Sequence, residues 1–264
     1  MAKPLIVTTE SSEWLTNSYL VADRPGGTGV LIDSNGDLQP LLDAAREHDV
    51  TIEKLLLTHH HWDHVVSHAE DAQAAGGVPV LAAKETAELI DGVDETFVHG
   101  EIIEAGDLLI EALHTPGHCS DHHALVVRLR GDGADVAPTL FSADVLFHGT
   151  VGGTVNGGPD GFTQLKRSIT ELFAPLPDDT DVRPGHRTPT TLAAERADNP
   201  FLRVWAGTDP EGDEPVEIVE LREDLDGPAT LVLWAPDYDG GNKAWVRYPD
   251  GRDVIVGGSR VKRT

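Results

Sequence analysis

A dense group of potential metal ligands stands in one short stretch of the chain. Residues 59–64 read His-His-His-Trp-Asp-His and come directly after an apolar run that ends at Leu57. His59 and His61 are two positions apart, so in an extended segment both side chains point the same way. Asp63 and His64 follow where a loop is expected to turn into a helix. Imidazole and carboxylate groups at this spacing predict a site for zinc or a related divalent ion.

Three more residues of ligand type follow at the ends of later expected strands. They are His118 after Thr-Pro-Gly, Asp144 after Phe-Ser-Ala, and His186 after Pro-Gly. A lone histidine in a chain with 13 of them is more often structural than a ligand. A structural role does not explain why four separate segments each place a potential ligand near the end of a strand. We therefore expect all of them to converge on one metal centre.

The elements that must position these residues alternate between strand and helix. Apolar runs bounded by turn residues predict strands at 5–7, 19–22, 29–32, 54–57, 78–82, 108–113, 124–129, 139–141 and around Val182. Amphipathic periodicity predicts helices at 38–48, 65–75, 84–90, 163–173 and 190–197. This alternation is typical of a layered α/β fold.

The texture of the sequence changes after Pro200. Strands are expected at 217–221, 230–234, 243–248 and 253–256, with a hairpin turn at Asp250-Gly251. We therefore predict two parts, a catalytic domain over 1–205 and a small β-rich C-terminal appendage over 206–264. So small a β unit is not expected to be stable alone. It should pack on the main domain, cover a sheet edge or make a homodimer contact. We expect the side chains of Trp245 and Tyr248 to pack in this unit more than to line a substrate pocket.

The ordered ligand set resembles the metallo-β-lactamase superfamily, whose pattern is His-x-His-x-Asp-His, a later His, a later Asp and a final His. The resemblance covers about residues 5–203 and implies a four-layer αββα sandwich. It also implies that His59, His61 and His118 hold a first metal, and that Asp63, His64 and His186 hold a second. Asp144 would bridge the two ions, which we expect to be zinc, with iron or manganese as the other options.

An enzyme with such a centre would be a binuclear metal-dependent hydrolase. A bound dication lowers the pKa of water from 15.7 to roughly 7, so metal-bound hydroxide is available at neutral pH. Asp63 is expected to be catalytic as well as a ligand, because it could orient the nucleophile or carry a proton. Among the neighbouring histidines, His122 is the best candidate to orient a ligand from behind. Cys119 is expected to pack.

The residue at position 144 separates the branches of the superfamily. Zinc β-lactamases commonly place a thiolate there, whereas Asp144 matches the thioesterase, lactonase, phosphodiesterase and dioxygenase branches. Residues 184–195 and 146–153 are similar to segments of short glyoxalase II-like (hydroxyacylglutathione hydrolase-like) proteins. Two features depart from them: Gly153 stands where an arginine is common, and the C-terminal part is β instead of helical, which points to a thiol other than glutathione.

Thioester hydrolysis is therefore the leading hypothesis. The alternatives are a mononuclear iron persulfide dioxygenase, in which residues corresponding to His59, His118 and Asp144 hold the iron, and a lactonase of the same fold. A non-catalytic binding module is disfavoured, because such members of the superfamily usually lose ligands and this chain keeps the full set.

Charge and composition limit the partners. The formal net charge is −25, and no basic patch is evident, so nucleic acid and anionic membrane surfaces are not expected to bind. The single cysteine excludes an intrachain disulfide. The N-terminal apolar run is too short for a signal peptide and no run reaches membrane-spanning length, so we expect a cytoplasmic enzyme with a small-molecule substrate.

Overall fold

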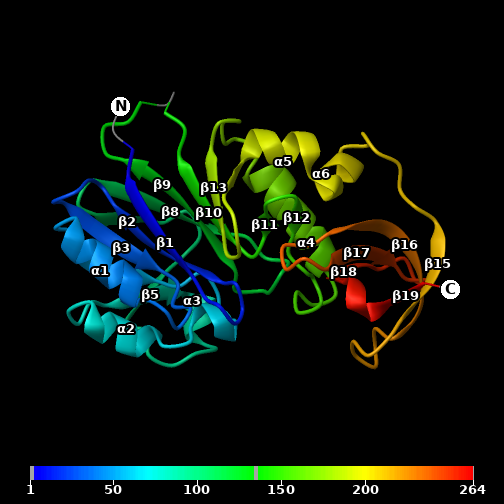
Figure 1. The fold of residues 1–264 in the computed structure, drawn as a ribbon. Helices are drawn as coiled ribbons and strands as arrows, with labels where there is room; N and C mark the ends of the chain where they lie inside the picture. Colours follow the sequence, from blue (N-terminus) through cyan, green and yellow to red (C-terminus); the bar gives the residue numbers. More distant parts are fainter. Residues whose placement is uncertain (1–2, 134–135, 264) are drawn as a thin grey trace.

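Two six-stranded sheets face each other in the computed structural model, which describes residues 3–133 and 136–263 (Figure 1). The first sheet has the order β1-β2-β3-β4-β5-β6. Its strands are β1 (Leu5–Glu10), β2 (Asn17–Ala22), β3 (Thr28–Ile32), β4 (Thr51–Leu56), β5 (Val80–Ala83) and β6 (Glu95–Phe97). From β3 to β6 all neighbours pair in parallel, so the carboxyl ends of these strands meet at one edge.

The second sheet has the order β14-β13-β10-β9-β8-β7. Its strands are β7 (Ile102–Ala105), β8 (Leu108–His114), β9 (His123–Leu129), β10 (Thr139–Ala143), β13 (Asp181–Pro184) and β14 (Thr190–Thr191). β10 and β13 pair in parallel, so Asp144 and His186, which come just after them, leave the sheet at the same edge. A separate hairpin is formed by β11 (Leu146–Phe147) and β12 (Thr150–Val151).

Helices cover the outer face of each sheet. The helical elements are α1 (Gln39–Glu47), η1 (Trp62–His64), α2 (His68–Ala74), α3 (Lys84–Ala87), α4 (Gly161–Arg167), η2 (Ser168–Leu172), α5 (Leu192–Asp198), α6 (Pro200–Trp205) and η3 (Gly258–Arg260). Residues of α1 and α2 pack on the first sheet, and residues of α4, α5 and α6 pack on the second. A third apolar core lies between the two sheets. The expected four-layer αββα metallo-β-lactamase sandwich is confirmed.

Several predicted elements need correction. The helix predicted over 65–75 is shorter, since α2 begins only at His68 and ends at Ala74, and the separate 3-10 turn η1 precedes it. The helix predicted over 163–173 is α4 followed by the five-residue π-helical turn η2. The strands β6 and β7 and the helix α6 were not predicted, because each is too short to show a clear period.

The C-terminal residues form a third sheet with the order β18-β17-β16-β15-β19. Its strands are β15 (Glu214–Ile218), β16 (Gly227–Pro236), β17 (Asn242–Arg247), β18 (Asp253–Gly257) and β19 (Val261–Arg263). Trp245 is 2% exposed and shares a core with Phe162 of α4 and Phe201 of α6. The C-terminal sheet therefore packs on the helices that cover the second sheet (Figure 1). Tyr248 is buried within the sheet's own core. Both side chains therefore pack, as expected. Among the described helices, none is long and apolar enough to cross a membrane.

Candidate metal centre

Segments that follow strands at one edge of the two sheets carry all seven predicted ligands. His59 and His61 follow β4, and the 3-10 turn η1 presents Asp63 and His64. His118 lies in the connection between β8 and β9. Asp144 and His186 lie just beyond the carboxyl ends of the parallel pair β10 and β13. Sheet topology thus brings together residues that are up to 127 positions apart, from His59 to His186.

Two groups of neighbouring ligand atoms match the sets that the superfamily pattern implies, beside a group of His59, His64 and Asp144 and one of His60, His61 and Cys119. In the two matching groups, the ligand atoms of His59, His61 and His118 lie within 4.8 Å of one another, and so do those of Asp63, His64 and His186.

Asp144 lies between these groups. Its Oδ1 is 3.3 Å from His64 Nε2, and its Oδ2 is 3.4 Å from His118 Nε2 and 3.3 Å from His186 Nε2. One carboxylate therefore faces ligands of both groups, which is the placement that a bridging role needs.

The donor atoms suit divalent cations. Among the described residues, His59 Nε2, His64 Nε2 and Asp144 Oδ1 are buried side-chain atoms with no hydrogen-bond partner. A buried polar atom without a partner is costly, and coordination of a cation would satisfy all three. The set of imidazole nitrogens and carboxylate oxygens matches zinc, iron or manganese. The residues present thus fit the metal that the family pattern implies.

Hydrogen bonds behind the ligands set which ring nitrogen faces the centre. His64 Nδ1 lies 2.8 Å from Asp33 Oδ2, and His118 Nδ1 lies 2.9 Å from the carbonyl oxygen of Gly153. His186 Nδ1 is 3.1 Å from the carbonyl oxygen of Trp14. Because these oxygens can only accept, each Nδ1 must carry the proton, and each neutral ring turns its Nε2 lone pair towards the centre.

Asp63 of η1 is held by a residue that lies just before β2. Thr16 Oγ1 donates to Asp63 Oδ2 over 2.6 Å. Asp63 remains the most accessible of the centre's two carboxylates, with its side chain 20% exposed against 8% for Asp144. Asp63 is therefore the carboxylate best placed to exchange a proton with substrate or solvent.

The sequence analysis missed Asp33 and Thr16. Asp33 follows β3 directly and has a positive φ of 59°, an uncommon conformation for a residue other than glycine. An acid next to a buried strand end was the available signal. Thr16 has no such pattern around it.

The remaining histidines and Cys119 lie around the ligands. His122 is fully buried, its Nε2 accepts from the backbone N–H of Asp144, and its Nδ1 lies 2.8 Å from Thr115 Oγ1. It thus orients the backbone that carries Asp144, in keeping with the prediction that it acts from behind the ligands. His60 Nδ1 lies 2.7 Å from Asp121 Oδ1, and its ring contacts that of His61 with centroids 4.8 Å apart. Cys119 is buried, and burial raises the pKa of its thiol, so it stays protonated.

Electrostatics divides the histidines into two kinds. Burial lowers the pKa of His59, of His118 and of His61, the last to about 4, so these rings are neutral and able to donate a lone pair. Burial alone would also lower the pKa of His64, but the negative charges of Asp144 and Asp33 outweigh it and raise that pKa well above the usual value. The surroundings of His64 therefore favour positive charge, which a proton supplies in the metal-free chain and which a bound cation would supply beside the neutral ring.

Gly185 allows the close approach of the last ligand segment. A Cβ atom at this position would lie 2.1 Å from Asp144 Oδ1 and 3.0 Å from His64 Cε1. No other residue type leaves that space free, which explains a glycine immediately before His186.

A hollow of ≈ 470 Å³ opens beside His186. It is lined by Glu10, His148, His186, Arg187, Thr188 and Tyr238. Because a predicted ligand lines it, this hollow is the candidate substrate cavity.

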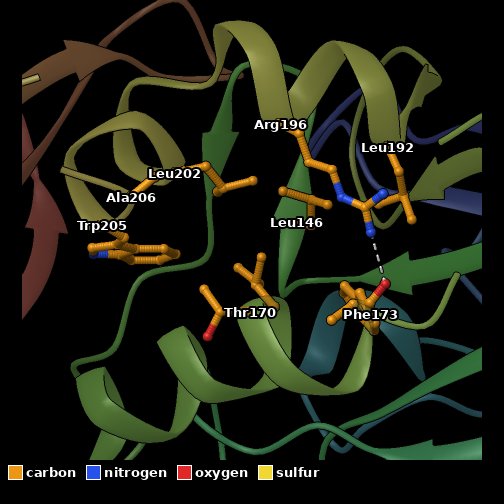
Figure 2. Close-up of a pocket in the computed structure, with 10 residues that line it drawn as sticks. Leu146, Thr170, Phe173, Leu192, Arg196, Leu202, Trp205 and Ala206 are labelled. Carbon is orange, nitrogen blue, oxygen red and sulfur yellow. Dashed lines mark hydrogen bonds between the residues drawn. The ribbon is translucent and has the colours of Figure 1, made fainter. Parts of the chain in front are cut away.

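A second hollow of similar size lies between the helices that cover the second sheet (Figure 2). Its lining is largely apolar, and Arg196 at its rim donates to the carbonyl oxygen of Phe173. None of the seven predicted ligands lines it. It is therefore separate from the metal centre.

Comparisons with known proteins agree with the site. A family model described as "Metallo-beta-lactamase superfamily" matches residues 12–196. A hydroxyacylglutathione hydrolase of Rhizobium meliloti is 30% identical over 227 residues, which cover 72% of this chain and 84% of that protein. The structure of ETHE1 from Myxococcus xanthus superposes with a TM-score of 0.64 at 28% identity, covering 75% of this chain and 84% of that one.

A protein solved in a di-iron-bound form, TTHA1623, has a TM-score of 0.58 at 28% identity and is covered over its whole length, against 74% of this chain. The family match spans every one of the seven predicted ligands, from His59 to His186. The chain therefore belongs to the metallo-β-lactamase superfamily, in its glyoxalase II-like branch.

Proposed function

We propose that this chain hydrolyses a thioester of a small acyl group, with two divalent metal ions held by the seven residues of the centre. The observation that carries the proposal is the pair of ligand groups on either side of Asp144, each with ligand atoms within 4.8 Å. A 30% identical relative named hydroxyacylglutathione hydrolase supports the thioester as substrate. Zinc is the proposed metal, and iron or manganese would fit the same donors.

The residues of the centre would have separate roles in the reaction. His59, His61 and His118 would hold one ion, Asp63, His64 and His186 the other, and Asp144 would touch both. When bound, the ions supply hydroxide at neutral pH and draw charge from the substrate oxygen. Asp63, held by the hydroxyl of Thr16, is positioned to accept or return a proton. A thiolate is a good leaving group, so no further acid is required.

The C-terminal sheet and the candidate cavity bear on the thiol that is released. In the superfamily's glutathione-specific members a helical C-terminal domain binds glutathione, whereas here a five-stranded sheet occupies the C-terminal residues. The candidate cavity presents the guanidinium of Arg187, which already pairs with Glu10 at 3.1 Å. We therefore propose a thiol carrier without several negative charges.

The test is a panel of acyl thioesters of glutathione, coenzyme A and simpler thiols with the zinc-loaded protein. Hydrolysis that is lost in Asp144→Asn and on chelation is expected, because both remove the bridged centre. Failure to cleave any member of the panel would refute the proposal. His68→Ala is the control, because both ring nitrogens of His68 lie against backbone carbonyl oxygens, those of Val65 and Asp91, and not against a predicted ligand.

A second candidate is an iron-dependent persulfide dioxygenase, which the likeness to ETHE1 over 84% of that chain favours. Elemental analysis separates the two, since about two zinc ions per chain support the hydrolase. One iron per chain, with oxygen consumption on a persulfide, would support the dioxygenase. Turnover of acyl-homoserine lactones in the same panel would point to a lactonase.

A further inference from the structure

One aromatic side chain of the C-terminal sheet reaches the metal centre. Tyr238 lies in the turn between β16 and β17, and its ring stacks on the imidazole of His186 with centroids 4.4 Å apart and planes inclined by 15°. Phe147 of β11 contacts both rings, with centroids 4.8 Å from Tyr238 and 5.7 Å from His186. The C-terminal sheet thus contacts a predicted ligand directly, although the sequence predicted only a connection between two strands at this point.

The turn that carries Tyr238 is anchored to the main domain. Lys243 is 5% exposed, and its Nζ donates to the carbonyl oxygen of Val151 over 2.8 Å and pairs with Asp237 Oδ1 at 3.0 Å. The same ammonium lies 5.2 Å from the ring centroids of both Phe147 and Tyr238. A buried charge is costly unless it is paired, so these contacts hold the turn in one position.

His186 needs such a restraint. Its Nδ1 makes one hydrogen bond, to the carbonyl oxygen of Trp14, and its Nε2 faces Asp63 and Asp144 at 3.5 and 3.3 Å. A single hydrogen bond fixes the direction of the ring but not its rotation about that axis. A parallel aromatic face on one side and an aromatic edge on another restrict that rotation.

We propose that Tyr238 is a positioning residue that fixes the plane of His186 and so sets the affinity of the second metal position. The C-terminal sheet is on this view a part of the metal centre. The inference rests on the proposed two-metal site, and it concerns metal binding instead of the substrate. It can therefore hold or fail independently of thioester hydrolysis.

The test is a competitive zinc titration of the full chain against a chromophoric chelator. Tyr238→Phe keeps the ring and should bind both zinc equivalents as the wild type does. Tyr238→Leu keeps much of the volume but removes the aromatic face, and Tyr238→Ala removes both. We expect these two variants to bind the second equivalent roughly 10-fold more weakly, as is typical when an outer partner of a ligand is lost, and to bind the first within about twofold of wild type.

Cobalt provides an independent readout. In Tyr238→Leu the visible spectrum of the second cobalt equivalent should change while that of the first does not, and Tyr238→Phe should restore it.

Tyr248→Phe is the matched control for general weakening of the C-terminal sheet. Its hydroxyl donates to the carbonyl oxygen of Leu225 inside that sheet, away from the centre. It should unfold at a lower temperature and bind both equivalents normally. Equal losses at both metal positions in Tyr238→Leu, no loss at either, or the same loss in Tyr248→Phe would overturn the proposal. A wild-type chain that takes only one equivalent would overturn it too.

Discussion

Replacement of Asp33 by asparagine should weaken the second metal position through the tautomer of His64. Asp33 is 2% exposed and accepts three hydrogen bonds, from the N–H of Thr58 at 2.8 Å, from its hydroxyl at 2.9 Å and from His64 Nδ1 at 2.8 Å. An asparagine has one acceptor oxygen and one amide donor. If the oxygen serves Thr58, the amide faces His64 Nδ1, and the ring proton moves to Nε2, where it blocks the metal.

The magnitudes follow from these contacts. Loss of the partner behind a metal-bound histidine typically weakens metal binding by about 10–100-fold. Loss of a hydrogen bond between a charged acceptor and its donor costs about 1.5–3 kcal/mol. A loss near 2 kcal/mol would lower the unfolding midpoint of a chain of this size by roughly 4–8 °C. Zinc competition and thermal unfolding of the metal-free protein measure the two effects separately.

Asp121 offers a matched control. It is fully buried and also accepts three hydrogen bonds, from the N–H of His60 at 2.9 Å, from His60 Nδ1 at 2.7 Å and from Thr86 Oγ1 at 2.9 Å. Because His60 is not one of the seven predicted ligands, Asp121→Asn should lose similar stability but keep its zinc affinity. Equal zinc affinities in Asp33→Asn and Asp121→Asn would refute the reasoning.

Four further outcomes are expected. Chelation of the metal should lower the unfolding midpoint, and added zinc should restore it, since a ligand at 1,000 times its Kd adds about 4.1 kcal/mol; an unchanged midpoint would contradict the metal site. Thr16→Val removes the hydroxyl that donates to Asp63 over 2.6 Å, so turnover of the best thioester should fall about 10-fold; full turnover would show that Asp63 needs no such support. Gly185→Ala would place a Cβ 2.1 Å from Asp144 Oδ1, so metal content measured by elemental analysis should drop, and a normal content would show that the segment can shift. Trp245→Ala empties a site that is 2% exposed, and urea unfolding should show a loss of about 3–5 kcal/mol; a loss below about 1 kcal/mol would mean that the C-terminal sheet packs loosely.

The candidate metal site could be predicted from the sequence because each of its segments comes shortly after a strand. A buried strand has a strong apolar signature, and the residue after it is held by the sheet. The sequence alone therefore groups residues 59–64 with His118, Asp144 and His186. The division into two groups of three came from the resemblance to a family, and the geometry in the structure agrees with it. The domain boundary near residue 205 stays a prediction.

The residues that hydrogen-bond to the predicted ligands or stack on them could not be predicted from the sequence. Asp33 acts on His64 across 31 positions, and Thr16 acts on Asp63 across 47. Tyr238 comes from a turn that looks like any acidic turn, and it contacts His186 only because the third sheet packs on α4 and α6. Local sequence determines which residue ends each strand, since strand signatures are local. Which side chain from a distant segment lies against a given ligand depends on how the sheets pack, and that is decided by the tertiary structure alone.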